Sequence, residues 1–241
     1  MSLNIILPCA GKGSRLGLSY PKEIHQIDHD VRLIDLSFRL CLPYRKEINR
    51  VTIILTSSKQ EIVACLEKWS KSFNIVFCYF NNQYHEWPGS ILSAKHLFLE
   101  NNIVLLPDSR IIEHENHPLI PSMLNNLKQN DLVFAFIKEQ SKRLENLGAL
   151  TVDDNLTVTG FCDKPKSEWQ RYNAFWGSFG FKDFHSTAIL EMMMQSVQKQ
   201  TIDINQLNMK VAGFPIAQYV DLGTWENIRL ICSKEGGPAI I

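Results

Sequence analysis

Residues 3–22 read LNIILPCAGKGSRLGLSYPK, and this stretch decides the fold of the chain. The apolar run 5–7 predicts a buried strand, which Pro8 ends before a loop with three glycines. Glycines let the main chain come close to a bulky anion and turn its N–H groups toward it. Because open α/β sheets bind ligands at the carboxyl ends of their strands, we expect this loop to hold a phosphate-rich ligand.

Two cations flank the same loop. Arg15 and Lys22 add the positive charge that a polyphosphate requires, and our interpretation is that a nucleoside triphosphate binds here. The loop does not contain G-x-x-x-x-G-K-[ST], because Ser14 and Leu18 follow the candidate glycines. It does not contain G-x-G-x-x-G either, because Leu16 stands at the third glycine. The alternative is an ordinary glycine-rich turn between a strand and a helix.

The composition argues against several classes of protein. The chain has 241 residues, with 25 basic and 25 acidic side chains and a formal net charge of zero. This balance predicts no broad surface for nucleic acid or for an anionic membrane. No apolar run approaches the roughly 20 residues of a membrane-spanning helix, and the first residues lack the pattern of a signal peptide. Six scattered cysteines without a C-x-x-C pair fit a reducing compartment, so we expect a cytoplasmic protein.

The first half of the sequence alternates apolar runs of strand type with segments of helical spacing. After the first strand, the pattern predicts strands at 51–55, 74–80 and 103–106, and helices at 33–42, 58–69 and 89–99. Alternation of this kind is typical of a parallel sheet with helices on both faces.

The second half departs from strict alternation. It predicts helices at 119–127 and 184–197, strands at 132–137, 174–181, 209–214 and 216–220, and a last helix from 224. Residues 149–152 and 157–161 flank a polar turn, a pattern typical of an antiparallel hairpin. We therefore expect one α/β domain over residues 1–241, a three-layer Rossmann-like fold. Its central sheet is mostly parallel, with a small antiparallel hairpin region. Methionines 192–194 are expected to fill its core.

Two carboxylates stand where predicted strands end. Asp108 follows the buried run 103–106, and Asp221 follows the strand 216–220 and precedes the last helix. Carboxylates at strand ends face the crevice of the first loop, and their hard oxygens suit Mg²⁺. The sequence therefore predicts a magnesium site built from two distant segments. The alternative is that each aspartate only caps a turn.

Two segments carry a resemblance to a known family. Residues 8–24, PCAGKGSRLGLSYPKEI, resemble the signature L-A-A-G-x-G-[ST]-R-[LM] followed by P-K of the nucleotidyltransferases that make nucleoside diphosphate sugars. Residues 220–224, VDLGT, look like the [WV]-x-D-[IVT]-G-T segment of that family. The resemblance extends, more loosely, over residues 3–231. The compact spacing from Arg15 to Pro21 is similar to that of N-acetylglucosamine 1-phosphate uridylyltransferases and methylerythritol-phosphate cytidylyltransferases.

The resemblance implies an enzyme that joins a nucleoside triphosphate to a sugar 1-phosphate, with Mg²⁺ as cofactor, giving a nucleoside diphosphate sugar and pyrophosphate. It implies catalytic roles for Arg15 and Lys22, and metal ligation by Asp108 and Asp221. The nucleotide-binding positions that it implies are Ala10, Gly11, Gly13, Ser14, Gln83, Gly89 and Ser90, and the sugar-phosphate positions are Gly148, Lys164 and Asn173. Residues of about 1–110 then form a nucleotide half, and residues of about 111–241 form a sugar-phosphate half.

Several positions depart from the family pattern. Pro107 stands where glycine is common, Asp163 replaces the glutamate of E-K-P, and Leu147 replaces a tyrosine. Trp176 stands where small residues are usual, in the strand expected to line the sugar pocket. This last departure leaves the identity of the sugar open.

Two other functions stay open at this point. One is cytidylyl transfer to a non-sugar phosphate such as an alcohol or choline phosphate, which the compact loop permits. The other is a homologue that binds nucleotide without turnover. A glycosyltransferase is disfavoured because no D-x-D motif surrounds Asp108. The sequence leaves the nucleobase open, and it allows both a monomer and a homo-oligomer.

Overall fold

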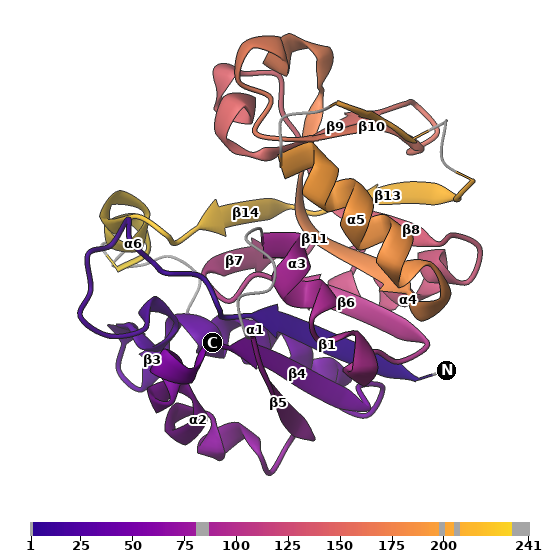
Figure 1. The fold of residues 1–241 in the computed structure, drawn as a ribbon. Helices are drawn as coiled ribbons and strands as arrows, with labels where there is room; N and C mark the ends of the chain where they lie inside the picture. The colour runs from indigo at the N-terminus through magenta and orange to yellow at the C-terminus, as the bar shows by residue number, and fades with distance from the viewer. Residues whose placement is uncertain (1, 81–86, 198–200, 205–207, 233–241) are drawn as a thin grey trace.

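The computed structural model describes residues 2–80, 87–197, 201–204 and 208–232 (Figure 1). At its centre, strand β1 (Leu3–Pro8) lies between β4 (Arg50–Leu55) and β6 (Asn101–Leu105) and pairs in parallel with both. Strand β5 (Ile75–Tyr79) adds to the far edge of β4, also in parallel. The continuous apolar runs of these central strands are buried, as in sheets covered on both faces. The predicted parallel sheet is confirmed.

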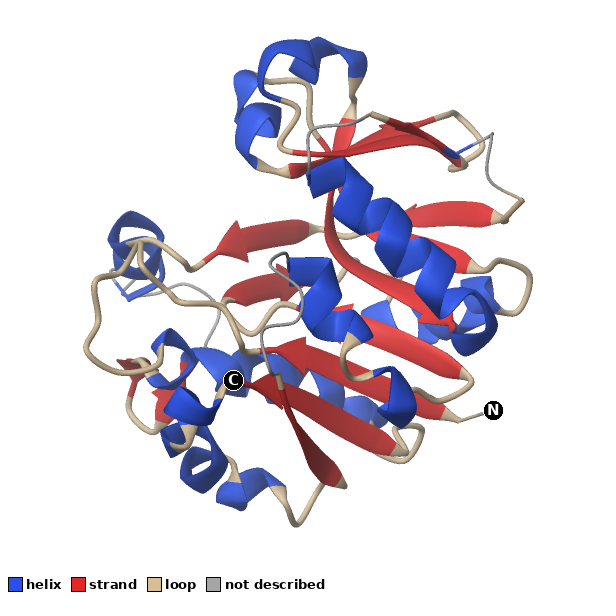
Figure 2. Ribbon diagram, viewed as in Figure 1, coloured by secondary structure: helices blue, strands red, loops and turns tan. Residues whose placement is uncertain are grey.

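Helices cover both faces of this sheet (Figure 2). Neighbouring residues of a strand face opposite sides, so Ile5 and Ile6 of β1 belong to two different apolar clusters. Helices α1 (Leu33–Cys41) and α4 (Leu119–Leu127) pack into the cluster of Ile5. Helices α3 (Trp87–Leu92) and α5 (Ser186–Val197) pack into the cluster of Ile6, where Met193 is fully buried as expected. The three-layer α/β domain is therefore confirmed.

Two predicted helices are shorter than expected. The segment 58–69 contains only α2 (Glu61–Cys65), between 3₁₀ turns at Ser57–Lys59 and Glu67–Trp69. The helix expected over 89–99 ends at Leu92, and a 3₁₀ turn at Lys95–Leu97 follows. The hydroxyl of Ser93 donates to the Ser90 carbonyl at 2.6 Å, which is the kind of local bond that weakens a helix interior.

Strand β11 (Ala174–Lys182) joins the parallel sheet to an antiparallel part. Residues 178–182 pair antiparallel with β6, while the first two residues pair with β9 (Gly148–Val152) on the same edge. Strand β9 forms the predicted hairpin with β10 (Val158–Asp163), and β12 (Ile202–Asp203) extends it. On its other edge β11 pairs with β8 (Leu132–Lys138), which in turn lies parallel to β13 (Val211–Pro215).

A separate two-stranded sheet joins the middle of the chain to its C-terminal part (Figure 1). It consists of β7 (Ser109–Ile112), which the sequence did not predict, and β14 (Gln218–Asp221). Its register places Ser109 opposite Asp221, and the N–H of Leu222 donates to the Asp108 carbonyl at 2.8 Å. This pairing brings the two predicted metal-binding aspartates to one place.

Two smaller features complete the fold. A hairpin of β2 (Gln26–Asp28) and β3 (Val31–Arg32), which was not predicted, leads into α1. Helix α6 (Trp225–Cys232) follows β14 as expected. Within the described residues, no helix has both the length and the apolar character to cross a membrane.

Candidate active site

The loop after β1 is fixed at its middle by the last helix. Gly13 and Gly17 have φ of +66° and +62°, a left-handed conformation that glycine adopts without the usual steric cost. Between them, Leu16 is buried in one cluster with Ile228 of α6. The indole Nε1 of Trp225 also donates to the Leu16 carbonyl oxygen at 3.0 Å. The loop is thus anchored on α6.

Lys22 reaches from the end of the loop to the first carboxylate. Its aliphatic stem passes Gly13, where an added Cβ would lie 3.4 Å from it, and its Nζ donates to the carboxylate of Asp108. Both side chains are mostly buried, with exposed fractions of 15% and 13%. Burial alone would lower the pKa of Lys22. The charge and hydrogen bond of Asp108 outweigh burial, so the pKa of Lys22 lies above its ordinary value. Lys22 is therefore a permanent cation at neutral pH.

Arg15 pairs with the second carboxylate. Its Nη1 donates to Oδ2 of Asp221 at 2.9 Å. Gly223 makes room for this contact, because a Cβ on that residue would lie 2.4 Å from Nη2 of Arg15. The N–H of Gly223 also donates to Oδ1 of Asp221 at 2.8 Å. The Arg15 side chain is 58% exposed, so this ion pair is open to solvent on one side.

A buried ion pair lies beneath the loop. Nζ of Lys59 donates to both carboxylate oxygens of Glu23, at 2.9 Å each. Glu23 is fully buried and follows Lys22 directly, within the 3₁₀ turn Lys22–Ile24. Cys9 is buried as well, and burial raises the pKa of its thiol, so this cysteine stays neutral and serves packing. The pair holds the turn that presents Lys22.

The loop, the two aspartates and the hairpin border one cavity of about 170 Å³. Five predicted site residues line it: Arg15, Asp108, Gly148, Lys164 and Asp221. Its other lining residues are Trp87, Leu106, Asn146, Leu147, Asp163, Trp176 and Tyr219. The structure therefore brings together residues that the sequence placed in four separate segments. Lys22 joins them through its hydrogen bond to Asp108.

Tyr219 is a cavity residue that the sequence reasoning missed. Burial and the charges of Asp108 and Asp221 raise the pKa of its phenol, so the hydroxyl stays neutral beside the carboxylates. A signal for it was present, because residues two apart on a strand share a face, and Tyr219 precedes Asp221 by two on β14.

The far end of the cavity is aromatic. The ring centroids of Trp87 and Trp176 lie 5.4 Å apart. The centroids of Trp176 and Phe179 lie 5.5 Å apart, and the planes of these two rings are nearly perpendicular. The Trp176 indole rests on Gly148, where an added Cβ would lie 1.9 Å from Nε1. This glycine is therefore required by the close approach of an indole.

Other predicted site residues do not line this cavity. The N–H of Val152 donates to Oδ1 of Asn173 at 2.9 Å, and Nδ2 of Asn173 donates to the Val152 carbonyl oxygen at 2.8 Å. These two hydrogen bonds tie the residue that precedes β11 to β9. Gly89 and Ser90 are buried in α3, where the Ser90 hydroxyl donates to the Trp87 carbonyl at 2.7 Å.

The remaining nucleotide-binding predictions concern the loop and one position beyond the described residues. Ala10, Gly11, Gly13 and Ser14 follow β1, with Gly11 and Ser14 exposed to solvent. Gln83 lies outside the described residues.

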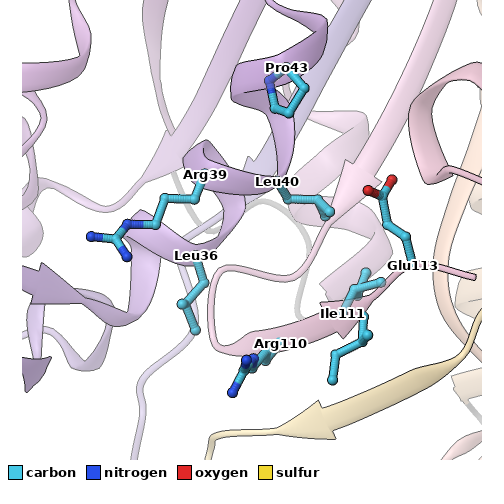
Figure 3. A pocket seen from close by; sticks show the side chains of 8 residues that line it. Leu36, Arg39, Leu40, Pro43, Arg110, Ile111 and Glu113 are labelled. Atoms are coloured by element: carbon cyan, nitrogen blue, oxygen red, sulfur yellow. The ribbon is translucent and has the colours of Figure 1, made fainter. Parts of the chain in front are cut away.

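A second pocket of about 340 Å³ lies between α1 and β7 (Figure 3). It is lined by Leu36, Arg39, Leu40, Pro43 and residues 110–113. None of the predicted site residues is among them. In the part of the chain that the structure describes, no three His, Cys, Asp or Glu side chains are grouped to hold a metal by themselves.

The fold and the cavity define a class of enzyme. A model of the nucleotidyl transferase family matches residues 3–231, and the chain belongs to this family. It is a nucleotidyltransferase.

Solved structures share the fold at low sequence identity. A UDP-glucose pyrophosphorylase from Acinetobacter baumannii superposes with a TM-score of 0.75 and 18% identity, covering 96% of this chain and 92% of that one. A UDP-glucose pyrophosphorylase complexed with UDP-glucose gives a TM-score of 0.72 and 16% identity, with coverages of 97% and 98%. HddC from Yersinia pseudotuberculosis gives 0.65 and 15%, with coverages of 97% and 99%. No protein of curated function matches the sequence.

Proposed function

We propose that this protein joins a nucleoside triphosphate to a sugar 1-phosphate, giving a nucleoside diphosphate sugar and pyrophosphate, with Mg²⁺ as cofactor. One observation carries the proposal: two loop cations, Arg15 and Lys22, each pair with a strand-end aspartate at one cavity that Lys164 also lines. The names of the solved relatives, two of which are UDP-glucose pyrophosphorylases, support a sugar phosphate as acceptor.

The two ion pairs supply charges for the triphosphate. Arg15 and Lys22 exchange their carboxylates for phosphate oxygens when the nucleotide enters, because phosphates carry more charge and accept the same hydrogen bonds. Arg15 is the more exposed cation and holds the departing pyrophosphate. Lys22 is the more buried one and stabilises the charge that develops on the α-phosphate, where a low local dielectric strengthens its effect. Residues of about 1–110 thus form most of the nucleotide side.

The acceptor enters from the hairpin side, formed within residues of about 111–241. Lys164 holds the phosphate of the acceptor, since this residue directly follows β10 and lines the cavity. One phosphate oxygen of the acceptor attacks the α-phosphorus in line. The bond to the oxygen that bridges to the β-phosphate breaks, and pyrophosphate leaves with that electron pair. Alignment and charge stabilisation supply the rate, and no side chain forms a covalent intermediate.

Mg²⁺ fits the chemistry of the donors. Asp108 and Asp221 both line the cavity, their oxygens are hard ligands, and phosphate oxygens and water complete such sites. Once the loop cations turn to phosphate, these two carboxylates are the groups that hold the ion. The bound ion supplies neutralisation of phosphate charge.

A second candidate function changes only the acceptor. The aromatic end of the cavity narrows the space beside Gly148, which favours a smaller phosphate such as an alcohol or choline phosphate. The nucleotide chemistry is the same in both cases.

Pyrophosphate release tests the proposal. The protein is incubated with Mg²⁺ and each of four nucleoside triphosphates, crossed with a panel of sugar 1-phosphates and phosphocholine. We expect release with a sugar 1-phosphate, and loss of release in Asp108→Asn. Release with phosphocholine alone would favour the second candidate. Triphosphate binding without release for any pair would overturn both and favour a non-catalytic nucleotide-binding homologue.

A further inference from the structure

The Trp176 indole occupies the wall of the cavity next to the acceptor side. It belongs to β11, at the bulge between Trp176 and Ser178, and is only 8% exposed. Two lining residues touch or flank it: Gly148, whose main chain lies against the ring, and Trp87 from α3. Phe179 supports it from the same strand. The ring is therefore held from three sides and does not simply fill an open surface.

The indole N–H makes tryptophan a costly residue for packing alone. Nε1 is buried and, among the described residues, has no hydrogen-bond partner. A buried unpaired donor lowers stability, whereas phenylalanine would pack here without that loss. The larger ring therefore points to a use of its volume inside the cavity.

We propose that Trp176 determines acceptor specificity by limiting the size of the sugar. The ring takes the space beside Gly148, in the same cavity that Arg15, Asp108 and Asp221 line. A sugar whose ring carries only hydroxyl groups fits the remaining space, while an N-acetyl group on the same ring overlaps the indole. This inference rests on the proposed function, because it names the class of sugar that the same cavity accepts.

Matched pairs of acceptors test the inference. Glucose 1-phosphate is compared with N-acetylglucosamine 1-phosphate, and galactose 1-phosphate with N-acetylgalactosamine 1-phosphate, by kcat/KM. Wild type should favour the plain member about tenfold or more, a size of discrimination that a single excluded group gives. Trp176→Ala should reduce this ratio at least tenfold, and Trp176→Phe, whose smaller ring keeps only part of the volume, should reduce it by an intermediate factor of about three. The KM for the triphosphate should not change in either variant.

Binding separates this inference from the proposed function. The same acceptors are titrated calorimetrically with Mg²⁺ and a triphosphate analogue that cannot be cleaved between the α- and β-phosphates. If no pair releases pyrophosphate, the proposed function fails, and the binding ratios of wild type and Trp176→Ala still decide the inference. Equal ratios in the two proteins, preference of wild type for the N-acetyl member, or binding to neither protein would overturn it. Binding of the N-acetyl member to Trp176→Ala alone would support it.

Discussion

The two walls of the cavity are built by different means. The loop wall is charged, with Arg15 and Lys22 facing Asp221 and Asp108, and it stands on a parallel sheet. The hairpin wall is largely apolar near Trp176, and it stands on antiparallel strands. In the proposed reaction the charged wall binds phosphates, which any acceptor shares, while the aromatic wall meets the part in which acceptors differ. We therefore expect that substitutions in one wall change turnover and substitutions in the other change acceptor choice.

The largest expected effect is a loss of turnover when a cation of the charged wall is removed. Lys22→Ala should lower turnover about 10²–10³-fold, because it removes a preorganised donor at the place where charge develops. Steady-state kinetics with each active acceptor measure it. The order of acceptor preference should stay the same, since the aromatic wall is intact.

The exposed Lys46→Ala variant is the matched control and should retain wild-type turnover. Near-normal turnover of Lys22→Ala would refute the role of this lysine. A change in acceptor order would show that the two walls are coupled.

The support beneath the loop gives the next effect. Glu23→Ala leaves Lys59 buried without its partner and should lower the free energy of unfolding by about 3 kcal/mol, as for other broken buried pairs. Chemical denaturation measures it, with the exposed Glu67→Ala as control. A loss below about 1 kcal/mol would show that the pair does not hold the loop.

The same residue gives a pH dependence of defined sign. Burial outweighs the ion pair with Lys59 and raises the pKa of the Glu23 carboxyl above its ordinary value of 4.5. Between pH 4.5 and the raised pKa, Glu23 keeps its proton in the folded protein but has lost it in the unfolded chain. This contribution to stability is complete below pH 4.5 and falls as the pH rises through the raised pKa. Glu23→Gln should remove this part of the dependence.

A smaller loss of turnover is expected at Asp221, which ends β14 and lines the cavity. Asp221→Asn should lower turnover about a hundredfold and raise the Mg²⁺ concentration for half-maximal rate, because an amide is a weaker ligand than a carboxylate. Titration of Mg²⁺ at saturating triphosphate measures both changes. Glu226→Gln, at an exposed position of α6, is the control. An unchanged Mg²⁺ requirement would exclude Asp221 as a ligand.

The smallest effect is expected at Trp225, whose indole anchors the loop through Leu16. Trp225→Phe removes the hydrogen bond to the Leu16 carbonyl, a loss of about 1 kcal/mol, which corresponds to roughly fivefold. We expect the KM for the triphosphate to rise by that factor, with kcat and acceptor preference unchanged. Trp169→Phe, on the hairpin side, should leave this KM unchanged. A selective fall of kcat in Trp225→Phe would contradict the anchoring role.

Short-range features of the sequence were enough to predict the central strands and several candidate site residues. The apolar runs of β1, β4 and β6 predicted buried parallel strands, because burial on both faces requires continuous apolar residues. Two loop residues, Arg15 and Lys22, and two strand-end residues, Asp108 and Asp221, were predicted as site residues, since a loop after a strand and the end of a strand are local features. The structure places these four side chains in two ion pairs at one cavity.

The contacts between distant segments depend on the tertiary structure. The pairing of β7 with β14 set Asp221 beside Asp108, and strand register between remote segments leaves no periodic signal in the sequence. The use of Asn173 was decided by the Val152 main chain, whose polar groups needed partners. The cavity was shaped by a Trp176 ring that packs on Gly148 from another strand. Local periodicity specifies which face a residue occupies, whereas close packing between remote residues specifies what the site will admit.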